Sequence, residues 1–430
     1  MELLSLFKTY AGLSRDIYYL CLARTINSTG DFVFSLITLV LTLQMGMNVV
    51  SAGIFVSMAA LISGPGVLLG GYLSDLMGKK TIIVIGQLLS AILIISCSFW
   101  SGTITVGYLL IAVMFFISIT RPAYNALIIQ LCTEEKERKS AFSLMYLGAN
   151  LGIAIGPLIA GFFIKDHVNI VFISIGTVFL ISTFIIINQV KIGTRKELAS
   201  TNSEHAGQQE QQRSSQPPSP LFRLLLKNPL VAFFIVVSFL NYFIYMQYSF
   251  SLPLQMNHSF GENGAAYYGS VMTINAISVI ILTTVILSAT RKLTALNSIA
   301  TGALFYGIGF GALNLLGTFP HFSIVALSTV LWTIGEILVQ TNINLYIASR
   351  VPDTHQGRFN GLLLFVGCLG YTLSPYLTGI FIKSMDMESV WIIILAVSLF
   401  YALSMIILWH IEKSSTRRNE MKPLDHSKNI

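Results

Sequence analysis

The stretch Gly71-Tyr-Leu-Ser-Asp-Leu-Met-Gly-Lys-Lys80 joins two apolar runs, each of which is long enough to cross a lipid bilayer. It predicts a polar hinge over residues 75–80, where Asp75 can cap a helix N-terminus and Gly78 permits a turn with positive φ. The two lysines that end the stretch are expected to hold the hinge at an anionic membrane surface. Because the connection is short, we expect two adjacent antiparallel helices, packed closely where the glycine pair 70–71 ends the first run.

The composition is that of an integral membrane protein. Of the 430 residues, 54% are hydrophobic and only 10% are charged, and the mean hydropathy is +0.73. Soluble domains carry about 25% charged residues. Residues 1–16 lack an apolar run followed by a small-residue cleavage site, so we expect the first spanning segment to act as its own insertion signal.

Twelve apolar runs predict an all-α membrane protein with twelve transmembrane helices, each near the ~20 residues that a span needs. The runs cover approximately 17–44, 51–74, 81–100, 105–131, 141–164, 168–190, 229–253, 266–288, 296–317, 323–349, 359–382 and 389–410.

The basic residues predict the orientation. With the N-terminus inside, the inner segments hold 22 of the 26 Lys and Arg residues, the outer segments hold Lys165 and Lys383, and Arg24 and Arg121 lie within spans. By the positive-inside rule both termini lie in the cytoplasm, and we expect a multi-pass protein of the plasma membrane. The net charge of +7 is then a consequence of topology, so the expected partner is the lipid bilayer and not nucleic acid.

The chain is predicted to form two six-helix halves. Residues 1–190 form the first half, residues 191–228 a polar cytoplasmic linker, residues 229–410 the second half and residues 411–430 a cytoplasmic tail. The halves repeat weakly at an offset near 218. This offset relates Gly152, Pro157 and Gly161 to Gly370, Pro375 and Gly379. Such a repeat predicts two pseudo-symmetric helical bundles.

The hinge resembles the loop G-x-L-x-D-x-x-G-[KR]-[KR] between the second and third helices of the major facilitator superfamily, although a charged turn between two spans would use similar residues. Leu76 departs from the basic residue usual after the aspartate. The resemblance implies the two-bundle fold of that superfamily, a monomeric carrier, and a central cavity lined by the first, fourth, seventh and tenth helices. The matching hinge residues are Gly71, Asp75, Gly78, Lys79 and Lys80.

The fifth run contains a second pattern, made of Gly148, Gly152, Gly156, Pro157 and Gly161. The four-residue spacing forms a smooth groove for a neighbouring helix, and the proline permits a bend. Ordinary close packing of helices is one interpretation. The run G-x3-G-x3-G-P-x2-A-G also resembles the fifth-helix signature of the superfamily's antiporters, with Ala160 in place of one glycine, and that resemblance implies export.

Four ionisable residues lie inside predicted spans: Arg24, Asp31, Arg121 and Glu336. A charged side chain at the centre of a bilayer costs at least ~3 kcal/mol, so a function is the default expectation. Internal salt bridges that only orient helices are the alternative. Glu336 lies near the midplane, about thirteen residues from the inner end of its run.

The charged residues are the predicted proton-coupling groups of the central cavity. Gly335-Glu336 resembles the acidic position of some proton-coupled multidrug exporters of the superfamily. Those exporters often carry a further acid in the fifth helix, where this chain offers Met145, so Asp31 is the candidate for a second proton site. The predicted substrate-cavity residues are Asn27, Asn125, Asn150, Asn241, Tyr245 and Gln340.

Other chemistry has little support in the sequence. Gly78-Lys79-Lys80 lacks the glycine that precedes the lysine of a phosphate-binding loop, and there is no His-Glu-x-x-His pattern. The histidines 167, 258 and 321 lie in or beside outer loops and are expected to be solvated. We therefore expect no enzyme, no metal and no cofactor, with the proton gradient as the driving force.

The resemblance to the drug:proton antiporter branch implies efflux of small amphipathic compounds by alternating access. Protonation of Glu336 and Asp31 would exclude substrate, while Arg24 and Arg121 would tune the acids or hold anionic groups. Two alternatives remain: a proton-coupled uptake symporter for a small metabolite, and a membrane sensor or assembly factor that does not transport.

Overall fold

The computed structural model describes residues 12–30, 37–132, 134–163, 167–191, 225–226, 228–351 and 353–420. It is built from helices, and no strand occurs among these residues, which confirms the predicted all-α class. Asp31, most of the linker 191–228 and the end of the tail, 421–430, lie outside the described residues.

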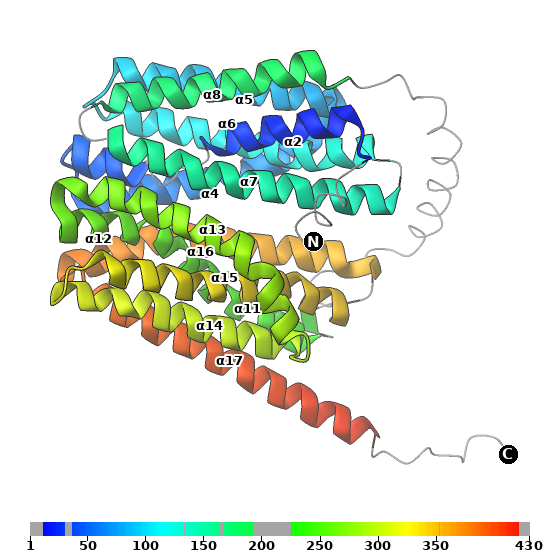
Figure 1. Cartoon of the computed structure of the whole chain (residues 1–430). Coiled ribbons are helices and arrows are strands. Elements are labelled where there is room, and N and C mark those ends of the chain that lie inside the picture. Colours follow the sequence, from blue (N-terminus) through cyan, green and yellow to red (C-terminus); the bar gives the residue numbers. More distant parts are fainter. Residues whose placement is uncertain are drawn as a thin grey trace, which may run out of the picture. The chain divides into compact units, whose positions relative to one another are not determined.

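The helices follow the apolar runs closely (Figure 1). Their bounds are α2 Arg15–Ser28, η1 Val40–Gln44, α4 Val49–Met77, α5 Lys79–Ser96, η2 Cys97–Phe99, α6 Thr105–Leu131, α7 Glu135–Phe163, α8 Val168–Gln189, α11 Pro229–Tyr245, η3 Met246–Tyr248, α12 Ser251–Phe260, η4 Gly261–Asn263, α13 Gly264–Thr290, α14 Ala295–Ala312, η5 Leu313–Gly317, α15 Phe322–Arg350, α16 Asp353–Ser384 and α17 Ser389–Glu420.

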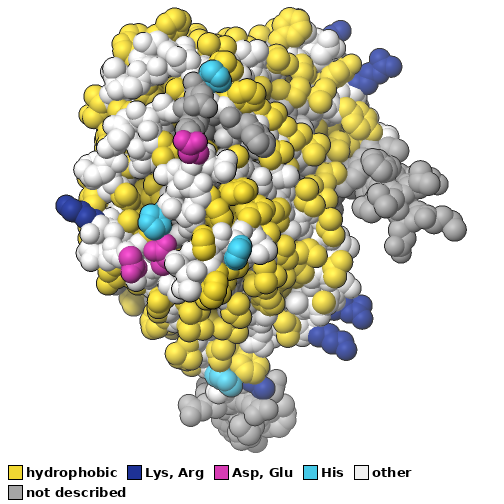
Figure 2. Space-filling model, turned by 60° about the vertical axis from the view of Figure 1, so that its left-hand side comes forward, with side chains coloured by type: hydrophobic (Ala, Val, Ile, Leu, Met, Phe, Trp, Pro, Cys, Tyr) yellow, Lys and Arg dark blue, Asp and Glu magenta, His cyan; other side chains and the backbone are white. Residues whose placement is uncertain are grey.

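Ten helical stretches of the described part are long and apolar enough to cross a membrane. One of them, Pro229–Thr290, contains both the seventh and the eighth predicted run. The first predicted run, 17–44, corresponds to α2 and η1, with residues 31–36 between them outside the described part. On the face that Figure 2 shows, hydrophobic side chains cover large areas and few charged side chains are visible. Such a surface suits a lipid environment.

The described residues group into two compact units. Unit 1 draws on 1–48, 58–227 and 268–276, and unit 2 on 49–57, 228–267 and 277–430. In unit 1, α2 packs against α7 and α8, and α5 packs against α6 and α8. In unit 2, α14 packs against α15 and α17, and α11 packs against α16 and α17. The predicted boundaries at residues 190 and 229 stay a prediction.

The glycines of the fifth-run pattern lie on α7, which continues through Pro157. A Cβ added at Gly152 would lie 2.5 Å from the carbonyl oxygen of Thr25 in α2, so this glycine allows two backbones to touch. Its repeat partner Gly370 on α16 has the same role toward α11, since a Cβ there would lie 2.9 Å from the carbonyl oxygen of Phe239. The contacts agree with the sequence repeat.

The hinge is shorter than predicted. The α4 helix runs on to Met77, and α5 begins at Lys79, so Gly78 alone separates them, at φ +90°. The positive φ confirms the predicted turn. The predicted capping by Asp75 is wrong: this residue is exposed in the last turn of α4, and no side chain caps α5.

The two glycines before the hinge differ in their surroundings. A Cβ at Gly70 would lie 2.2 Å from the carbonyl oxygen of Ile119 in α6, whereas a Cβ at Gly71 would meet no atom within 4 Å. The predicted close approach is therefore correct for Gly70 and wrong for Gly71, because only Gly70 faces α6.

Lys80 has a structural role in addition to the contact with the membrane surface that the sequence predicts. Its Nζ donates hydrogen bonds to the carbonyl oxygens of Ile187 at 2.9 Å and Val190 at 2.7 Å, at the end of α8. The last carbonyl groups of a helix lack partners within the helix and carry the negative end of its dipole. Lys80 therefore fastens the end of α8 to the start of α5.

Candidate functional site

Glu336 lies half-buried in the middle of α15, inside unit 2. Tyr245, in the last turn of α11, donates a 2.7 Å hydrogen bond from Oη to Oε1 of Glu336. The carboxyl group is thus joined to a second helix. The two residues were predicted separately, one as a proton-coupling group and one as a cavity residue, and the structure brings them together.

Aromatic rings surround this pair. The ring centroids of Tyr245 and Tyr248 are 4.8 Å apart, those of Tyr245 and Tyr306 are 6.3 Å apart, and Tyr248 stacks on Trp332 at 6.2 Å. Phe310 in turn stacks on Trp332 at 5.5 Å. We call these five residues the aromatic cluster. Their ring faces attract cations, and the phenol and indole groups add polar tips.

Asn241 and Gln340 extend the same region along α11 and α15. Asn241 lies one turn before Tyr245 on α11, and Gln340 lies one turn after Glu336 on α15. Asn241 therefore shares a helix face with Tyr245, and Gln340 shares one with Glu336. Asn241 is fully buried, and neither Nδ2 nor Oδ1 has a hydrogen-bond partner among the described residues. Gln340 is half-buried.

The two arginines predicted inside spans, Arg24 and Arg121, lie in unit 1. The guanidinium of Arg24 in α2 lies 5.7 Å from the ring centroid of Tyr124 in α6, in a cation–π contact. Arg121 is exposed on α6, and Asn125, one turn further along the helix, is exposed as well. Asn27 is buried, and Asn150 donates to the carbonyl oxygen of Tyr146 in its own helix.

A buried hydrogen-bond network holds Tyr124 below Arg24. Gln87 donates from Nε2 to the phenol oxygen of Tyr124 at 2.7 Å and to Ser182 at 3.3 Å. Thr183 donates to Oε1 of the same Gln87 at 3.0 Å, and Ser182 donates to the carbonyl oxygen of Ala23 at 2.8 Å. The network ties α5, α6, α8 and α2 together and fixes the ring on which Arg24 lies.

The sequence predicted Tyr245, Asn241 and Gln340 as cavity residues without placing them beside Glu336, and it missed several residues of the aromatic cluster. Tyr306, Phe310 and Trp332 sit in apolar runs, where an aromatic residue gives no signal of its own. Gln87 was a detectable signal, since an amide within an apolar span must find partners. Asp31, the proposed second acid, lies outside the described residues.

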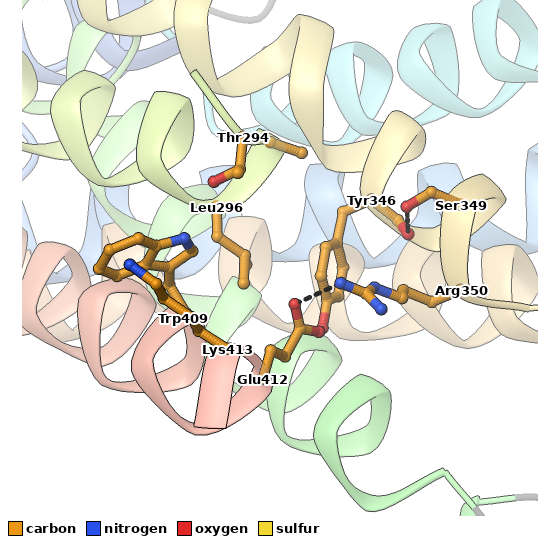
Figure 3. Close-up of a pocket in the computed structure, with 9 residues that line it drawn as sticks. Thr294, Leu296, Tyr346, Ser349, Arg350, Trp409, Glu412 and Lys413 are labelled. Atoms are coloured by element: carbon orange, nitrogen blue, oxygen red, sulfur yellow. Dashed lines mark hydrogen bonds and ion pairs between the residues drawn. The ribbon is translucent and has the colours of Figure 1, made fainter. Parts of the chain in front are cut away.

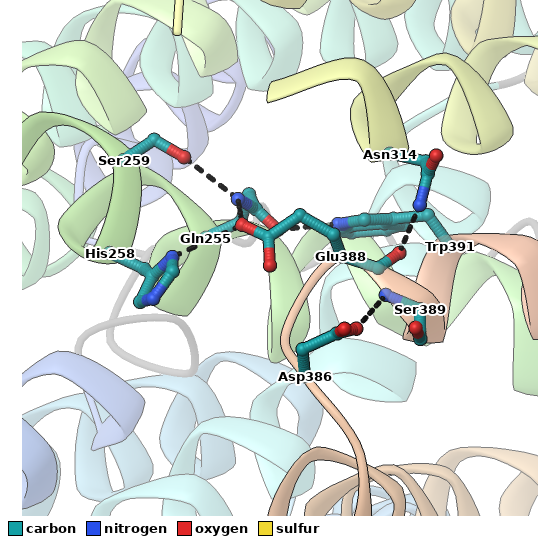
Figure 4. Close-up of polar contacts among 8 residues, drawn as sticks. All are labelled: Gln255, His258, Ser259, Asn314, Asp386, Glu388, Ser389 and Trp391. Atoms are coloured by element: carbon teal, nitrogen blue, oxygen red, sulfur yellow. Dashed lines mark hydrogen bonds and ion pairs between the residues drawn. The ribbon is translucent and has the colours of Figure 1, made fainter. Parts of the chain in front are cut away.

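A second polar group, in unit 2, joins α12 to the start of α17 (Figure 4). Nδ1 of His258 lies 3.2 Å from Oε1 of Glu388, and Gln255 donates to the same oxygen at 3.2 Å. Trp391 donates from Nε1 to Oε1 of Gln255 at 2.7 Å. The prediction that His258 is simply solvated is incomplete, because its exposed ring faces a carboxylate.

Comparisons with known proteins agree with this architecture. The family model of the Major Facilitator Superfamily matches residues 20–375. The uncharacterized MFS-type transporter YqjV of Bacillus subtilis (strain 168) is 24% identical over 343 residues, 79% of each chain. A second uncharacterized MFS-type transporter of that strain, YttB, is 23% identical over 371 residues, 86% of this chain and 89% of its own.

Solved structures share the fold. A POT family transporter in complex with 5-aminolevulinic acid gives a TM-score of 0.72 at 16% identity, covering 92% of this chain and 96% of its own. A mutant of the peptide transporter POT gives a TM-score of 0.74 at 14% identity, covering 95% and 98%. With the family model matched over most of its length, this chain belongs to the major facilitator superfamily and is a membrane transporter of that type, not an enzyme.

Proposed function

We propose that this transporter exports small amphipathic compounds in exchange for protons. The observation that carries the proposal is the hydrogen bond from Tyr245 to Glu336 inside the aromatic cluster, on helices apolar enough to span the membrane. An acid retained in a span at a cost of at least ~3 kcal/mol is expected to bind and release something.

The arrangement suits two competing ligands. When Glu336 is ionised, its charge and the surrounding ring faces attract an amphipathic cation. When the carboxyl group is protonated, that charge is lost and the cation is released. Binding of a proton and binding of substrate are then mutually exclusive, and a conformational cycle that requires one or the other couples the two fluxes.

The other predicted residues receive roles consistent with this cycle. Arg24 and Arg121 tune the acids or hold anionic groups of a substrate, and Asp31 is the second proton site. Asn27, Asn125, Asn150, Asn241 and Gln340 contribute polar contacts in the cavity. The pattern from Gly148 to Gly161 on α7 supports export, because it resembles the signature of antiporters.

The proposed cycle takes place in the plasma membrane. The two halves, residues 1–190 and 229–410, alternate access to a central site as a monomer, with both termini in the cytoplasm and the plasma membrane as location. The proton gradient drives the cycle without a cofactor. The excess of Lys and Arg in the predicted inner segments supports this orientation.

A second candidate function is proton-coupled uptake of a small metabolite. It draws on the neighbour structure of a POT family transporter that holds 5-aminolevulinic acid. The third possibility, a sensor or assembly factor on the same fold, predicts no flux of any compound.

Proteoliposomes with an imposed pH gradient distinguish these functions. The full-length protein and the Glu336→Gln variant are assayed for movement of ethidium, a cationic amphipathic dye, and of 5-aminolevulinic acid. Asp386→Asn, which also changes an acid to its amide but lies in an exposed loop, is the matched control. We expect ethidium to move against the direction of proton flow, with Asp386→Asn active and Glu336→Gln inactive.

The other outcomes point elsewhere. Co-transport of 5-aminolevulinic acid with protons would favour uptake, and the absence of flux for a broad panel of compounds would favour a sensor. Undiminished gradient-driven efflux by Glu336→Gln would remove Glu336 from the mechanism.

A further inference from the structure

A pocket of about 240 Å³ opens in unit 2 where α14 begins and where α15 and α17 approach their ends (Figure 3). It is unrelated to Glu336, and none of the roles proposed above uses it. The residues that line it are Thr294, Ala295, Leu296, Tyr346, Ser349, Arg350, Trp409, Glu412 and Lys413.

Two of the lining residues, Arg350 and Glu412, form an ion pair. Glu412 is buried, at 8% exposure, and it accepts hydrogen bonds from the phenol of Tyr346 and from Nη2 of Arg350, the latter at 2.7 Å. The side chain of Arg350 is 47% exposed. A guanidinium carries five N–H donors, so Arg350 can hold Glu412 and still donate to a second anion in the pocket.

Lys413 leaves the pocket with a positive charge. Because Arg350 neutralises Glu412, the charge of Lys413 is not balanced by another lining residue. Its Nζ lies 4.8 Å from the ring centroid of Trp409, in a cation–π contact with another lining residue.

The start of α14 adds to this potential. Thr294 caps the helix by accepting a hydrogen bond from the N–H of Asn297, and Ala295 and Leu296 form the first turn. First-turn N–H groups lack partners within the helix and lie at the positive end of its dipole, an arrangement that favours anions. A helix terminus, a lysine and an arginine thus converge on one pocket.

The surface beside the pocket suits hydrocarbon chains. Ile392 and Leu399 on α17 are 53% and 47% exposed, and Ile406 is half-buried. These residues recur at a seven-residue spacing that continues to Lys413, so they form one apolar stripe on the side of the helix that carries this lysine. Trp409 lies one turn before Lys413, and tryptophan is enriched at the level of lipid headgroups.

We propose that the pocket binds the phosphate headgroup of an anionic phospholipid, whose acyl chains lie along the stripe of α17. The phosphate accepts hydrogen bonds from Arg350 and from the first turn of α14 and contacts the charge of Lys413. A neutral zwitterionic lipid binds more weakly, because its choline group adds a positive charge beside Lys413.

Native mass spectrometry and thermal unfolding of the full-length protein in detergent test the proposal. The added ligand is phosphatidylglycerol, phosphatidylcholine or inorganic phosphate. We expect phosphatidylglycerol to remain bound and to raise the unfolding temperature, with weaker effects of the other two ligands. The Lys413→Gln variant should bind phosphatidylglycerol about tenfold more weakly, the effect of losing one charge-assisted contact.

Two further variants separate this site from general surface charge. Lys383→Gln removes the same charge from the last turn of α16, outside the pocket, and should bind like the wild type. Arg350→Gln combined with Glu412→Gln keeps the net charge but removes the guanidinium donors, and should bind weakly. Equal loss in Lys413→Gln and Lys383→Gln, equal retention of both lipids, or equal stabilisation by inorganic phosphate would each overturn the proposal.

Discussion

Tyr245 and Glu336 are joined by a 2.7 Å hydrogen bond that links α11 to α15, although the two residues are 91 positions apart in the sequence. A hydrogen bond to a charged group contributes about 1.5–3 kcal/mol. The bond therefore fixes the orientation of the carboxyl group that we propose to exchange protons.

The Tyr245→Phe variant should reduce gradient-driven transport about tenfold or more, because it removes the donor while keeping the ring. In the Glu336→Gln background the same change should lower the free energy of unfolding less than it does in the wild type, since the interaction is already altered. Transport of the Tyr245→Phe variant is measured in proteoliposomes, and the coupling is measured from the unfolding free energies of the four proteins in detergent. Tyr267→Phe, in a ring stack with Phe260 and Phe322, is the control. Unfolding free energies that change additively in the double variant would argue against the interaction between the two side chains.

Lys80 and Lys79 are neighbours that should respond differently to the same change. Lys80→Met removes the two hydrogen bonds to the end of α8 and should lower the free energy of unfolding by about 1–2 kcal/mol. Lys79→Met removes an equal charge and should have a smaller effect. Thermal unfolding in detergent compares them. If both variants lose the same stability, net charge and not the α8 contact is responsible.

Gly70→Ala and Gly71→Ala should change stability in opposite directions. A methyl group at Gly70 would press on the backbone of Ile119 and should cost about 1–3 kcal/mol. At Gly71 the methyl group meets open space, so the better helix propensity of alanine should add about 0.5–1 kcal/mol. Unfolding temperatures of the two variants give the sign directly. A stable Gly70→Ala protein would mean that α4 and α6 can separate without penalty.

Asp386 should contribute a stability that depends on pH. The side chain of Ser389 and its backbone N–H, which donates to Oδ1 of Asp386 at 2.7 Å at the start of α17, hold the pKa of this carboxyl group below the ordinary value. A lowered folded pKa means that the contribution is complete above the ordinary pKa of about 3.9 and is lost as the pH falls through the folded pKa.

Asp386→Ala should therefore unfold at a lower temperature than the wild type at pH 7, and the difference should shrink below about pH 4. Asp386→Asn keeps a capping oxygen and should retain most of the stability at pH 7. Unfolding temperatures between pH 3 and pH 7 test both statements. A difference that persists unchanged at pH 3 would contradict this role of the carboxylate.

The sequence predicted those features that depend on local chemistry. The turn at Gly78 follows from a glycine between two long apolar helices. Glu336 could be singled out as a candidate functional residue because an acid inside a span is costly. The helix bounds follow from apolar length. Each of these needs only residues that are close together in the chain.

Features that depend on distant contacts could not be predicted in this way. Lys80 meets carbonyl groups that lie 107 and 110 positions later. The aromatic cluster depends on which faces of α11, α14 and α15 turn toward one another, and an apolar run without periodicity does not fix its face. Asp75 was predicted to cap the next helix from a loop. The prediction is wrong because α4 continues through Met77, so Asp75 lies inside a helix.

Gly152 and Gly370 are equivalent positions of the two units, so the same substitution can be made at each and the two effects compared. Each glycine brings a helix to within touching distance of another in its own unit, and the two positions are 218 residues apart. Substituting either one alone gives a paired experiment in which the untouched copy serves as the reference. Any difference between the two outcomes reports how far the duplicated parts have diverged in the tolerance of their packing.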